Sequence, residues 1–286
     1  MVHRLHLRIF LHNQANYMIG TLLQNYIKLN VPTKKVAVLL SGGVDSISVG
    51  LAAHNVGRIV HAYSFKLDNK SSSDYDKAED VAQKMGWEFT GIEVPTNNLV
   101  DDWKRLHKLG CKKKTHFECV YPFLYVYPKI NEKYVLTGWG ADGYFGVSKK
   151  ATLRYRPESK NSPDTFDDFR NQYFLPHNCA GLAWHNKVIG DKIHVTPYLS
   201  SKVKKYFYQF TWEELNRPKQ KHHIRNAFPE FDDLKISNHK NLQHNGISDL
   251  FETLLNNSEI NYNNRKRIQD VCRDWYRSGI SEIQGL

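Results

Sequence analysis

A short apolar run followed by two glycines, an aspartate and two serines constrains the fold of this chain more than any other feature. The residues VLLSGGVDS occupy positions 38–46. A run of valine and leucine that ends at a glycine pair is typical of a parallel strand buried on both faces. We expect a helix to begin just beyond, at about Asp45 or Ser46. The segment therefore predicts a buried strand, a tight glycine loop and a helix in immediate succession.

The same alternation of strand and helix continues along the chain. Further strands are predicted at 58–65, 87–94 and 133–138, and helices at 13–29, 47–56, 74–86 and 98–109. Strands that alternate with helices are typical of a doubly wound, mostly parallel α/β sheet. Because ligands of such sheets bind at the carboxyl ends of the strands, we expect the functional residues there.

Composition divides the chain into three parts. Residues 1–33 are predicted to form a leading helical segment, and residues 34–150 the α/β core with the glycine loop. Residues 151–286 begin with a polar, proline-containing stretch and continue with segments typical of short helices. We interpret this third part as a mobile loop and a helical C-terminal region of the same domain, packed on the sheet.

Charge and cysteine content favour a soluble, cytoplasmic protein with an anionic ligand. The 40 Lys and Arg against 29 Asp and Glu give a net charge of +11, which favours nucleotides, pyrophosphate or nucleic acid as partners. Four scattered cysteines are typical of free thiols in a reducing compartment. No apolar run approaches the roughly 20 residues of a membrane span, so no membrane partner is expected.

The glycine loop has the chemistry of a polyphosphate site. Backbone N–H groups of Ser41, Gly42 and Gly43 would point at one spot together with the N-terminus of the next helix. Asp45 would repel an anion there unless a divalent cation lay between them, so the loop predicts a polyphosphate with magnesium. The segment has neither the lysine of G-x-x-x-x-G-K-[ST] nor the spacing of G-x-G-x-x-G.

Several motifs resemble those of one family. SGGVDS after a buried strand resembles the pyrophosphate loop (PP-loop) of the ATP pyrophosphatase superfamily, and VLTGWGADGYFG at 135–146 resembles the L-S-G-E-G-A-D-E-L-F-G of asparagine synthetases. The segments at 73–86 and 220–228 also resemble that family's synthetase domain. The resemblance runs from about residue 15 to about residue 235 and implies an adenine nucleotide alpha hydrolase-like fold. The last fifty or so residues resemble nothing recognisable.

The resemblance implies ATP and Mg²⁺ as cofactors and assigns residues to them. Asp45 and Asp142 would ligate the metal, and Lys221 would neutralise charge on the α-phosphate. The alternative for Lys221 is a solvated lysine in a basic run. The residues implied for the β- and γ-phosphates are Ser41, Gly42, Gly43, Asp45 and Ser46, and those implied to frame the adenosine are Leu39, Ser64, Phe65, Thr137 and Gly138.

Three positions depart from the family pattern. Trp139 and Gly143 stand where the family has acidic residues, and Ser200 replaces the aspartate of P-F-L-D. The first of these acidic residues is thought to manage protons during attack by the amine. Tryptophan cannot accept a proton. Either another group takes over that role or the acceptor differs.

The leading functional hypothesis is an ATP-dependent carbon–nitrogen ligase. It would adenylate a small-molecule carboxylate, release pyrophosphate and transfer the acyl group to ammonia or an amine. With valine at position 2 and only about forty residues before the loop, we expect no glutaminase on this chain, so nitrogen would come from a separate glutaminase, free ammonia or a substrate amine. The alternatives are a PP-loop enzyme that modifies a nucleobase or tRNA, and a catalytically silent ATP-binding homologue. The nucleic-acid alternative is not favoured, because no C-x-x-C pair or RNA-binding module is present.

Overall fold

The computed structural model describes residues 18–68, 70–111, 119–147, 166–171, 175–234 and 236. The first part of the predicted leading helix, the predicted mobile loop at 151–165 and the last fifty residues lie outside this range. Residues 18–30 are helical, as predicted for the second half of the leading segment.

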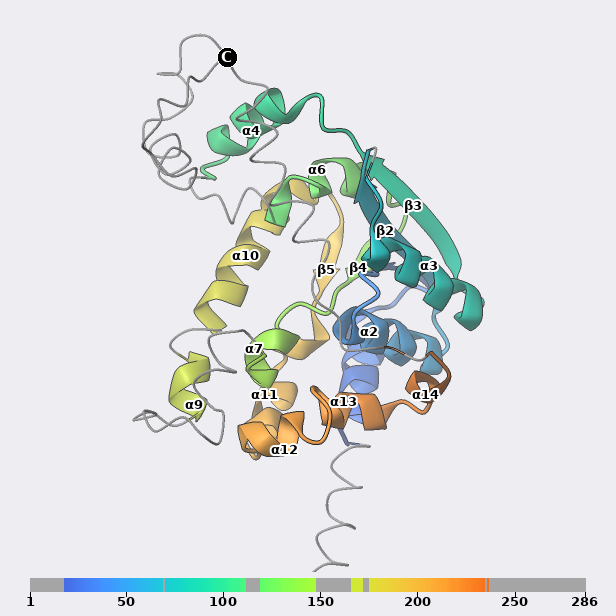
Figure 1. Cartoon of the computed structure of the whole chain (residues 1–286), viewed down its shortest axis with the longest axis vertical. Helices are drawn as coiled ribbons and strands as arrows, with labels where there is room; N and C mark the ends of the chain where they lie inside the picture. The colour runs from blue at the N-terminus through green and yellow to red at the C-terminus, as the bar shows by residue number, and fades with distance from the viewer. Residues whose placement is uncertain are drawn as a thin grey trace, which may run out of the picture.

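Five parallel strands form one sheet. They are β1 (Lys35–Leu39), β2 (Ile59–Leu67), β3 (Glu88–Val94), β4 (Tyr134–Leu136) and β5 (Ile193–Val195), in the order β3-β2-β1-β4-β5 (Figure 1). The chain runs outward from β1 to β3 in one direction and then crosses to the other side of β1 for β4 and β5. The reversal between β1 and β4 is the place where doubly wound sheets bind ligands. The predicted fold class is confirmed.

Helices connect and cover the strands. The helix α2 (Val44–Asn55) follows β1, and α3 (Ser73–Met85) follows β2. The remaining helical elements are α4 (Leu99–Lys108), α6 (Phe123–Val126), η1 (Tyr127–Lys129), α7 (Ala141–Phe145), α9 (Phe166–Phe169), α10 (Leu175–Val188), η3 (Pro197–Leu199), α11 (Ser201–Phe207), α12 (Trp212–Asn216), α13 (His222–Ala227) and α14 (Glu230–Leu234). The short helices α11 to α14 agree with the helical character predicted for this part of the C-terminal region.

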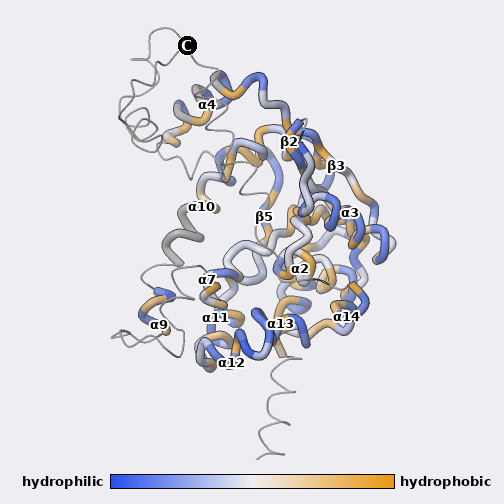
Figure 2. The backbone as a smooth tube through the Cα atoms, viewed as in Figure 1, coloured by the Kyte–Doolittle hydropathy of each residue, from blue (hydrophilic) through white to orange (hydrophobic). Residues whose placement is uncertain are grey.

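The residues of β1 face two different hydrophobic clusters. Val36 and Val38 belong to a cluster with α2, whereas Ala37 belongs to a second cluster with α6 and η1. Successive side chains of a strand point to opposite faces, so both faces of β1 are covered. Figure 2 shows apolar residues concentrated on α2, while α3 carries more polar ones. The central strand is therefore buried on both sides, as its continuous apolar run predicts.

Capping residues fix the ends of α3. Ser72 accepts a hydrogen bond from the backbone N–H of Tyr75 at the start, and Gly86 ends the helix in the left-handed region with φ 64°. A serine cap and a terminal glycine satisfy backbone groups that a helix leaves unpaired. These signals explain why the sequence predicts this helix to within one residue at either end.

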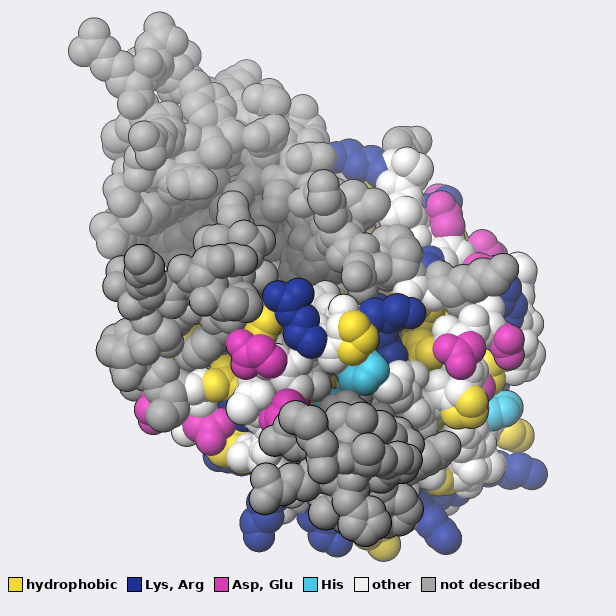
Figure 3. Space-filling model, turned by 60° about the horizontal axis from the view of Figure 1, so that its bottom comes forward, with side chains coloured by type: hydrophobic (Ala, Val, Ile, Leu, Met, Phe, Trp, Pro, Cys, Tyr) yellow, Lys and Arg dark blue, Asp and Glu magenta, His cyan; other side chains and the backbone are white. Residues whose placement is uncertain are grey.

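Charges of both signs lie on the surface around the C-terminal helices. On the face shown in Figure 3, Lys and Arg side chains are interspersed with Asp and Glu. Within the described parts of the chain, no helix is long and apolar enough to cross a membrane.

Candidate active site

The loop after β1 joins that strand to the N-terminus of α2. Helix α2 begins at Val44 with Gly43 before it, and no side chain caps its first turn. Gly42 has φ 68°, and a Cβ there would lie 2.8 Å from the carbonyl oxygen of Asp74, so only glycine fits. A Cβ on Gly43 would meet only the Ser41 hydroxyl, at 3.3 Å. The space beside the Cα of Gly43 is therefore largely open, and anion binding by the amides of this loop stays a prediction.

Hydrogen bonds of two serine side chains stabilise this loop. The Oγ of Ser46 accepts a hydrogen bond from the backbone N–H of Ser41 and donates one to the carbonyl of Gly43, each at 3.1 Å. The hydroxyls of Ser41 and Ser46 also lie 3.1 Å apart. The five predicted phosphate-binding residues are therefore neighbours, and the serines stabilise the loop's shape. Their contact with phosphate stays a prediction.

Lys221 joins the two predicted metal ligands. Its Nζ donates to Asp45 Oδ2 at 2.5 Å and to Asp142 Oδ1 at 2.6 Å. The side chains of Lys221 and Asp45 are only 13% and 18% exposed, whereas that of Asp142 is 59% exposed. The alternative that Lys221 is a solvated lysine is therefore wrong. Three residues distant in sequence form one charged cluster beside the glycine loop.

The backbone holds Lys221 in an unusual conformation. It has φ 59° and ψ 39°, and in the described chain it is the one residue other than glycine with positive φ. Its N–H donates to the Asn216 side chain, whose amide group in turn donates to the carbonyl of Phe145 on α7. Left-handed conformations of ordinary residues persist where the surroundings enforce them, often at functional sites. Asn216 thus ties Lys221 to the helix that carries Asp142.

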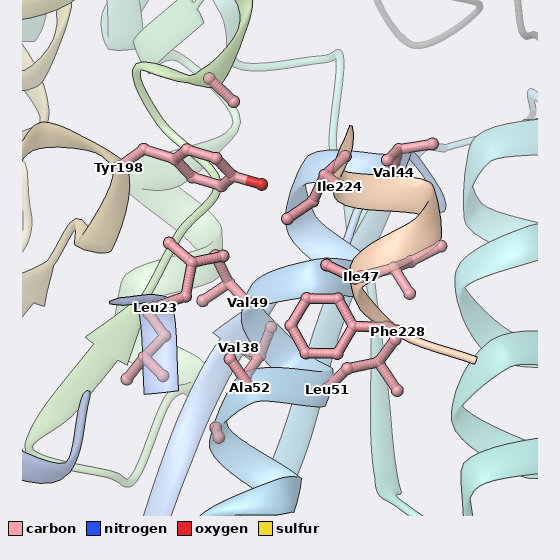
Figure 4. Packing of buried hydrophobic residues seen from close by; sticks show 14 of the residues in the cluster. Leu23, Val38, Val44, Ile47, Val49, Leu51, Ala52, Tyr198, Ile224 and Phe228 are labelled. Carbon is pink, nitrogen blue, oxygen red and sulfur yellow. The ribbon is translucent and has the colours of Figure 1, made fainter. Parts of the chain in front are cut away.

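Packing brings α13 to the start of α2. Ile224 and Phe228 lie against Ile47 and Leu51 of α2 in one apolar cluster (Figure 4). Lys221 immediately precedes α13, so this cluster carries its side chain to the glycine loop. Tyr198 approaches from the other side, and its hydroxyl lies 2.7 Å from that of Ser48.

The pKa values of Asp45 and Lys221 are both raised, for different reasons. Burial, reinforced by Asp142 and opposed by the Lys221 charge, raises the pKa of Asp45 to about 6. Burial alone would lower the pKa of Lys221, but attraction to Asp142 and Asp45 outweighs it and raises that pKa above its ordinary value. The lysine therefore stays charged at neutral pH.

The carboxylates fit a magnesium ion. Asp45 Oδ1 is buried and has no hydrogen-bond partner among the described residues, so a ligating oxygen remains available. Magnesium in nucleotide sites is held by one or two carboxylates together with substrate phosphates. No group of three or more His, Cys, Asp or Glu that could hold a metal occurs in the described segments, so the rest of the shell would come from phosphates and water.

The residues predicted to frame adenosine gather at the carboxyl ends of three adjacent strands. Leu39, Ser64, Phe65, Thr137 and Gly138 lie at the ends of, or just beyond, β1, β2 and β4. The Ser64 hydroxyl is buried and has no partner in the part of the chain that the structure describes. A Cβ on Gly138 would lie 2.6 Å from the carbonyl carbon of Asp45. The loop after β4 therefore touches the start of α2.

The three departures from the family pattern have clear structural surroundings. Trp139 packs on the ring of His185, with centroids 4.9 Å apart. Gly143 is buried within α7. Ser200 caps α11, accepting a hydrogen bond from the N–H of Val203. Serine at position 200 therefore still supplies an oxygen that caps the helix, but it lacks the negative charge of the family's aspartate.

A parallel sheet whose first strand ends in SGGVDS, with two aspartates and a lysine clustered beside that loop, has the architecture of the nucleotide-binding PP-loop class. Within this class the chain belongs to the asparagine synthase family, whose model matches residues 22–264. The match extends beyond residue 235, where the motif resemblance ends. It confirms the family expected from the motifs and identifies the matched region as a synthetase domain, and membership supports an ATP-dependent ligase.

Comparison with solved structures finds similar chains. NMN synthetase from Francisella tularensis is 14% identical with a TM-score of 0.36, covering 65% of this chain and 98% of its own. The NH3-dependent NAD synthetase from Campylobacter jejuni is 15% identical with a TM-score of 0.34, covering 80% and 98%. A predicted subunit of a tRNA methyltransferase from Methanocaldococcus jannaschii is 15% identical with a TM-score of 0.28, covering 69% and 93%. A search of curated proteins finds no match.

Proposed function

We propose that this protein is an ATP-dependent ligase that adenylates a carboxylate, releases pyrophosphate and forms an amide. The observation that carries the proposal is the contact of Lys221 with both Asp45 and Asp142 beside the glycine loop. Two carboxylates suit a divalent cation, and a fixed ammonium suits the charge that builds up on a phosphate during displacement. Family membership supports the same class of reaction.

In the proposed reaction, the amides of Gly42, Gly43 and the start of α2 bind the β- and γ-phosphates, while the N–H of Ser41 stays bonded to Ser46 Oγ within the loop. A substrate carboxylate oxygen attacks the α-phosphorus, and the bond to the bridging oxygen breaks to release pyrophosphate. The amine nitrogen then attacks the acyl carbon, the bond from that carbon to the phosphate oxygen breaks as AMP leaves, and the nitrogen releases one proton to the solvent. Backbone donors that are fixed before the reaction stabilise the negative charge on the phosphate oxygens at little reorganisation cost.

Asp45 and Asp142 would hold the magnesium ion, which supplies positive charge to the leaving pyrophosphate. The same carboxylate oxygens now contact the Lys221 ammonium. A divalent cation bound by the carboxylates of Asp45 and Asp142 would replace the ammonium as their counter-ion. Lys221 could then donate to an oxygen of the α-phosphate.

The acyl acceptor is proposed to be ammonia or an amine. Nitrogen would come from solution, from an amine on the substrate, or from a separate glutaminase. The residue at position 139 bears on this choice, because tryptophan in place of a carboxylate leaves the acceptor's proton without its usual base.

A screen for pyrophosphate release tests the proposal. The chain is incubated with Mg²⁺, ATP and a panel of carboxylic acids, with and without ammonium or amines, while AMP and pyrophosphate are measured. We expect release with at least one acid, and Asp45→Ala should abolish it. Asp80→Ala is the control, because that aspartate pairs with Lys84 on the exposed face of α3.

The alternatives predict different results in the same screen. Pyrophosphate release only with RNA or nucleosides would favour a nucleobase-modifying enzyme. No release with any compound would favour a silent ATP-binding homologue. A near-normal rate in Asp45→Ala would contradict the role of the carboxylate.

A further inference from the structure

The Lys221 ammonium is already the counter-ion of both proposed metal ligands. It donates to Asp45 Oδ2 at 2.5 Å and to Asp142 Oδ1 at 2.6 Å. A divalent cation that bound the two carboxylates would have to compete with this ammonium, because like charges repel strongly at such short range. Metal binding at this site therefore depends on what happens to the Lys221 side chain.

The surroundings of Lys221 keep its ammonium between the carboxylates. The backbone N–H of Lys221 donates to Asn216, and its Nζ lies 6.0 Å from the ring centroid of Phe145, within range of a cation–π attraction. The side chain of Lys221 is largely buried. A buried charge that loses its partners is strongly destabilising. The ammonium therefore leaves the carboxylates only when other acceptors take it over.

A hydrated ion from solution has little access to the remaining carboxylate oxygens. Asp45 Oδ1 is buried and has no hydrogen-bond partner among the described residues. The side chain of Asp142 is more than half exposed, so an ion can approach it. However, a single exposed carboxylate that already pairs with an ammonium holds a divalent ion only weakly.

The balance of charge also disfavours a free cation. Arg225 on α13 is within electrostatic reach of Asp45: burial lowers the pKa of Arg225, and attraction to Asp45 opposes that shift. Two carboxylates thus face two cationic side chains, and the cluster is nearly neutral without a metal. It exerts little net attraction on a free divalent ion, whereas a triphosphate would bring several negative charges that need compensation.

We propose that Lys221 excludes free Mg²⁺ from Asp45 and Asp142, so that the cation enters only as its complex with a polyphosphate. Phosphate oxygens offer the ammonium new acceptors, and the carboxylate oxygens that it leaves bind the divalent cation. No covalent bond changes in this exchange, and every charged group keeps a partner of opposite charge. The inference rests on the proposed function, because it takes the two aspartates as metal ligands.

The exchange couples the two ligands of the site. The metal binds tightly only after phosphate oxygens have drawn Lys221 away from the carboxylates. Because coupling between two binding sites is reciprocal, the metal raises the affinity for the polyphosphate by the same factor. The chain without nucleotide is therefore expected to hold no magnesium at this cluster.

Titration with Mn²⁺ tests the exclusion without any turnover. Mn²⁺ prefers the same oxygen ligands as Mg²⁺, and the EPR signal of the free ion shows how much is bound. At about pH 8, where carboxylates are ionised, the wild-type chain without nucleotide should bind Mn²⁺ weakly. Lys221→Met should bind one Mn²⁺ at least tenfold more tightly, because the competing ammonium is gone.

Further variants locate the gained ion. Adding Asp142→Asn to Lys221→Met should abolish the gain, because one of the two ligands is lost. Lys84→Met is the matched control: Lys84 also pairs with an aspartate, Asp80, but on the exposed face of α3, and its removal should create no site. Lys221→Arg keeps a positive charge in the cluster, so its Mn²⁺ affinity should stay within about threefold of wild type.

Two measurements on the wild-type chain need no substitution. Mg²⁺ alone at about 1 mM should change the melting temperature by less than about 1 °C, because a ligand that does not bind does not stabilise. Calorimetric titration with α,β-methylene-ATP, which cannot be cleaved between its α- and β-phosphates, measures the coupling. This analogue should bind at least tenfold more tightly with Mg²⁺ than with EDTA.

The outcomes distinguish the exclusion from the ligase function. Equal Mn²⁺ affinity in the wild-type chain and Lys221→Met, whether both bind tightly or both weakly, overturns the exclusion. The same analogue affinity with Mg²⁺ and with EDTA overturns the coupling and with it the proposal. A failure to release pyrophosphate with any carboxylic acid contradicts the ligase function instead, and the metal titrations still decide the role of Lys221.

Discussion

Lys221 has two electrostatic partners and one backbone restraint. The carboxylates of Asp45 and Asp142 hold its ammonium, and Asn216 holds its backbone N–H. A side chain fixed in this way loses little further entropy when it meets a phosphate. The left-handed backbone at Lys221 costs on the order of 1 kcal/mol or more, which its packing and hydrogen bonds offset.

Lys221→Met should reduce kcat far more than it weakens ATP binding. The ammonium is proposed to stabilise charge that develops only during adenylation, and loss of one such donor typically lowers kcat about 100- to 1,000-fold. Steady-state kinetics with varied ATP measure both effects. Lys84→Met on α3 is the control. A rise in KM with kcat unchanged would show that Lys221 serves only to bind.

The raised pKa of Asp45 makes the stability of the metal-free protein depend on pH. The folded chain keeps a proton on Asp45 that the unfolded chain releases between about pH 4 and pH 6. The contribution of this group to the unfolding free energy is therefore greatest below about pH 4 and falls as the pH rises through 6.

Asp45→Asn should remove that dependence. The unfolding free energy of the variant relative to wild type is expected to rise by roughly 2 to 3 kcal/mol between pH 4 and pH 7, because the amide does not ionise. Urea unfolding in the presence of EDTA measures the difference. A difference that stays constant with pH would contradict the assigned burial of the carboxylate.

At the scale of elements, two glycine loops meet beside β1. The loop after β4 approaches α2 so closely that a Cβ on Gly138 would overlap the backbone of Asp45, whereas a Cβ on Gly43 would meet only the hydroxyl of Ser41. Gly138 is therefore needed for packing between elements. Gly43 instead leaves room for the proposed ligand.

Alanine at the two glycines should therefore have different effects. Gly138→Ala should destabilise the fold by about 1 to 3 kcal/mol, because backbone must shift, and should also abolish ATP turnover. Gly43→Ala should change the unfolding free energy by less than about 1 kcal/mol while strongly weakening ATP binding. Chemical denaturation and ATP titration distinguish them. Equal destabilisation by both substitutions would contradict this division of roles.

Elements with strong local signals could be predicted from sequence, and those without could not. The apolar run of β1 and the capped ends of α3 specify these elements directly. The strand β5 was missed, because it has only three residues, Ile193–Val195, and depends on pairing with β4 for its formation. Very short strands are specified by their neighbours rather than by their own sequence.

The candidate site divides in the same way. The glycine loop, Asp142 and Lys221 lie in motifs and were predicted. The contact of Trp139 with His185 carries no motif. It depends on two segments distant in sequence that meet in space, which no spacing in the sequence encodes.

At the scale of the whole molecule, ligand binding and folding involve the same contacts. The charged cluster joins α2, α7 and the residue before α13, so a ligand held there would tie separate elements together. A ligand that binds only the folded chain stabilises it in proportion to the logarithm of its concentration.

Magnesium and ATP together should raise the melting temperature. At a hundred times the dissociation constant the ligand contributes about 2.7 kcal/mol, or roughly 5 to 10 °C for a chain of this size. Differential scanning fluorimetry measures the shift, which EDTA should reduce and Asp45→Ala should abolish. An equal shift in Asp45→Ala would place the nucleotide elsewhere.

Product analysis of ATP labelled at the α-phosphate tests the central claim most directly. The claim is that the loop at 41–46 holds the triphosphate so that it breaks between its α- and β-phosphates. In the presence of magnesium and a reactive carboxylic acid, all label should appear in AMP and the acyl-adenylate, with pyrophosphate in equal amount. Label in ADP, with release of inorganic phosphate, would contradict it.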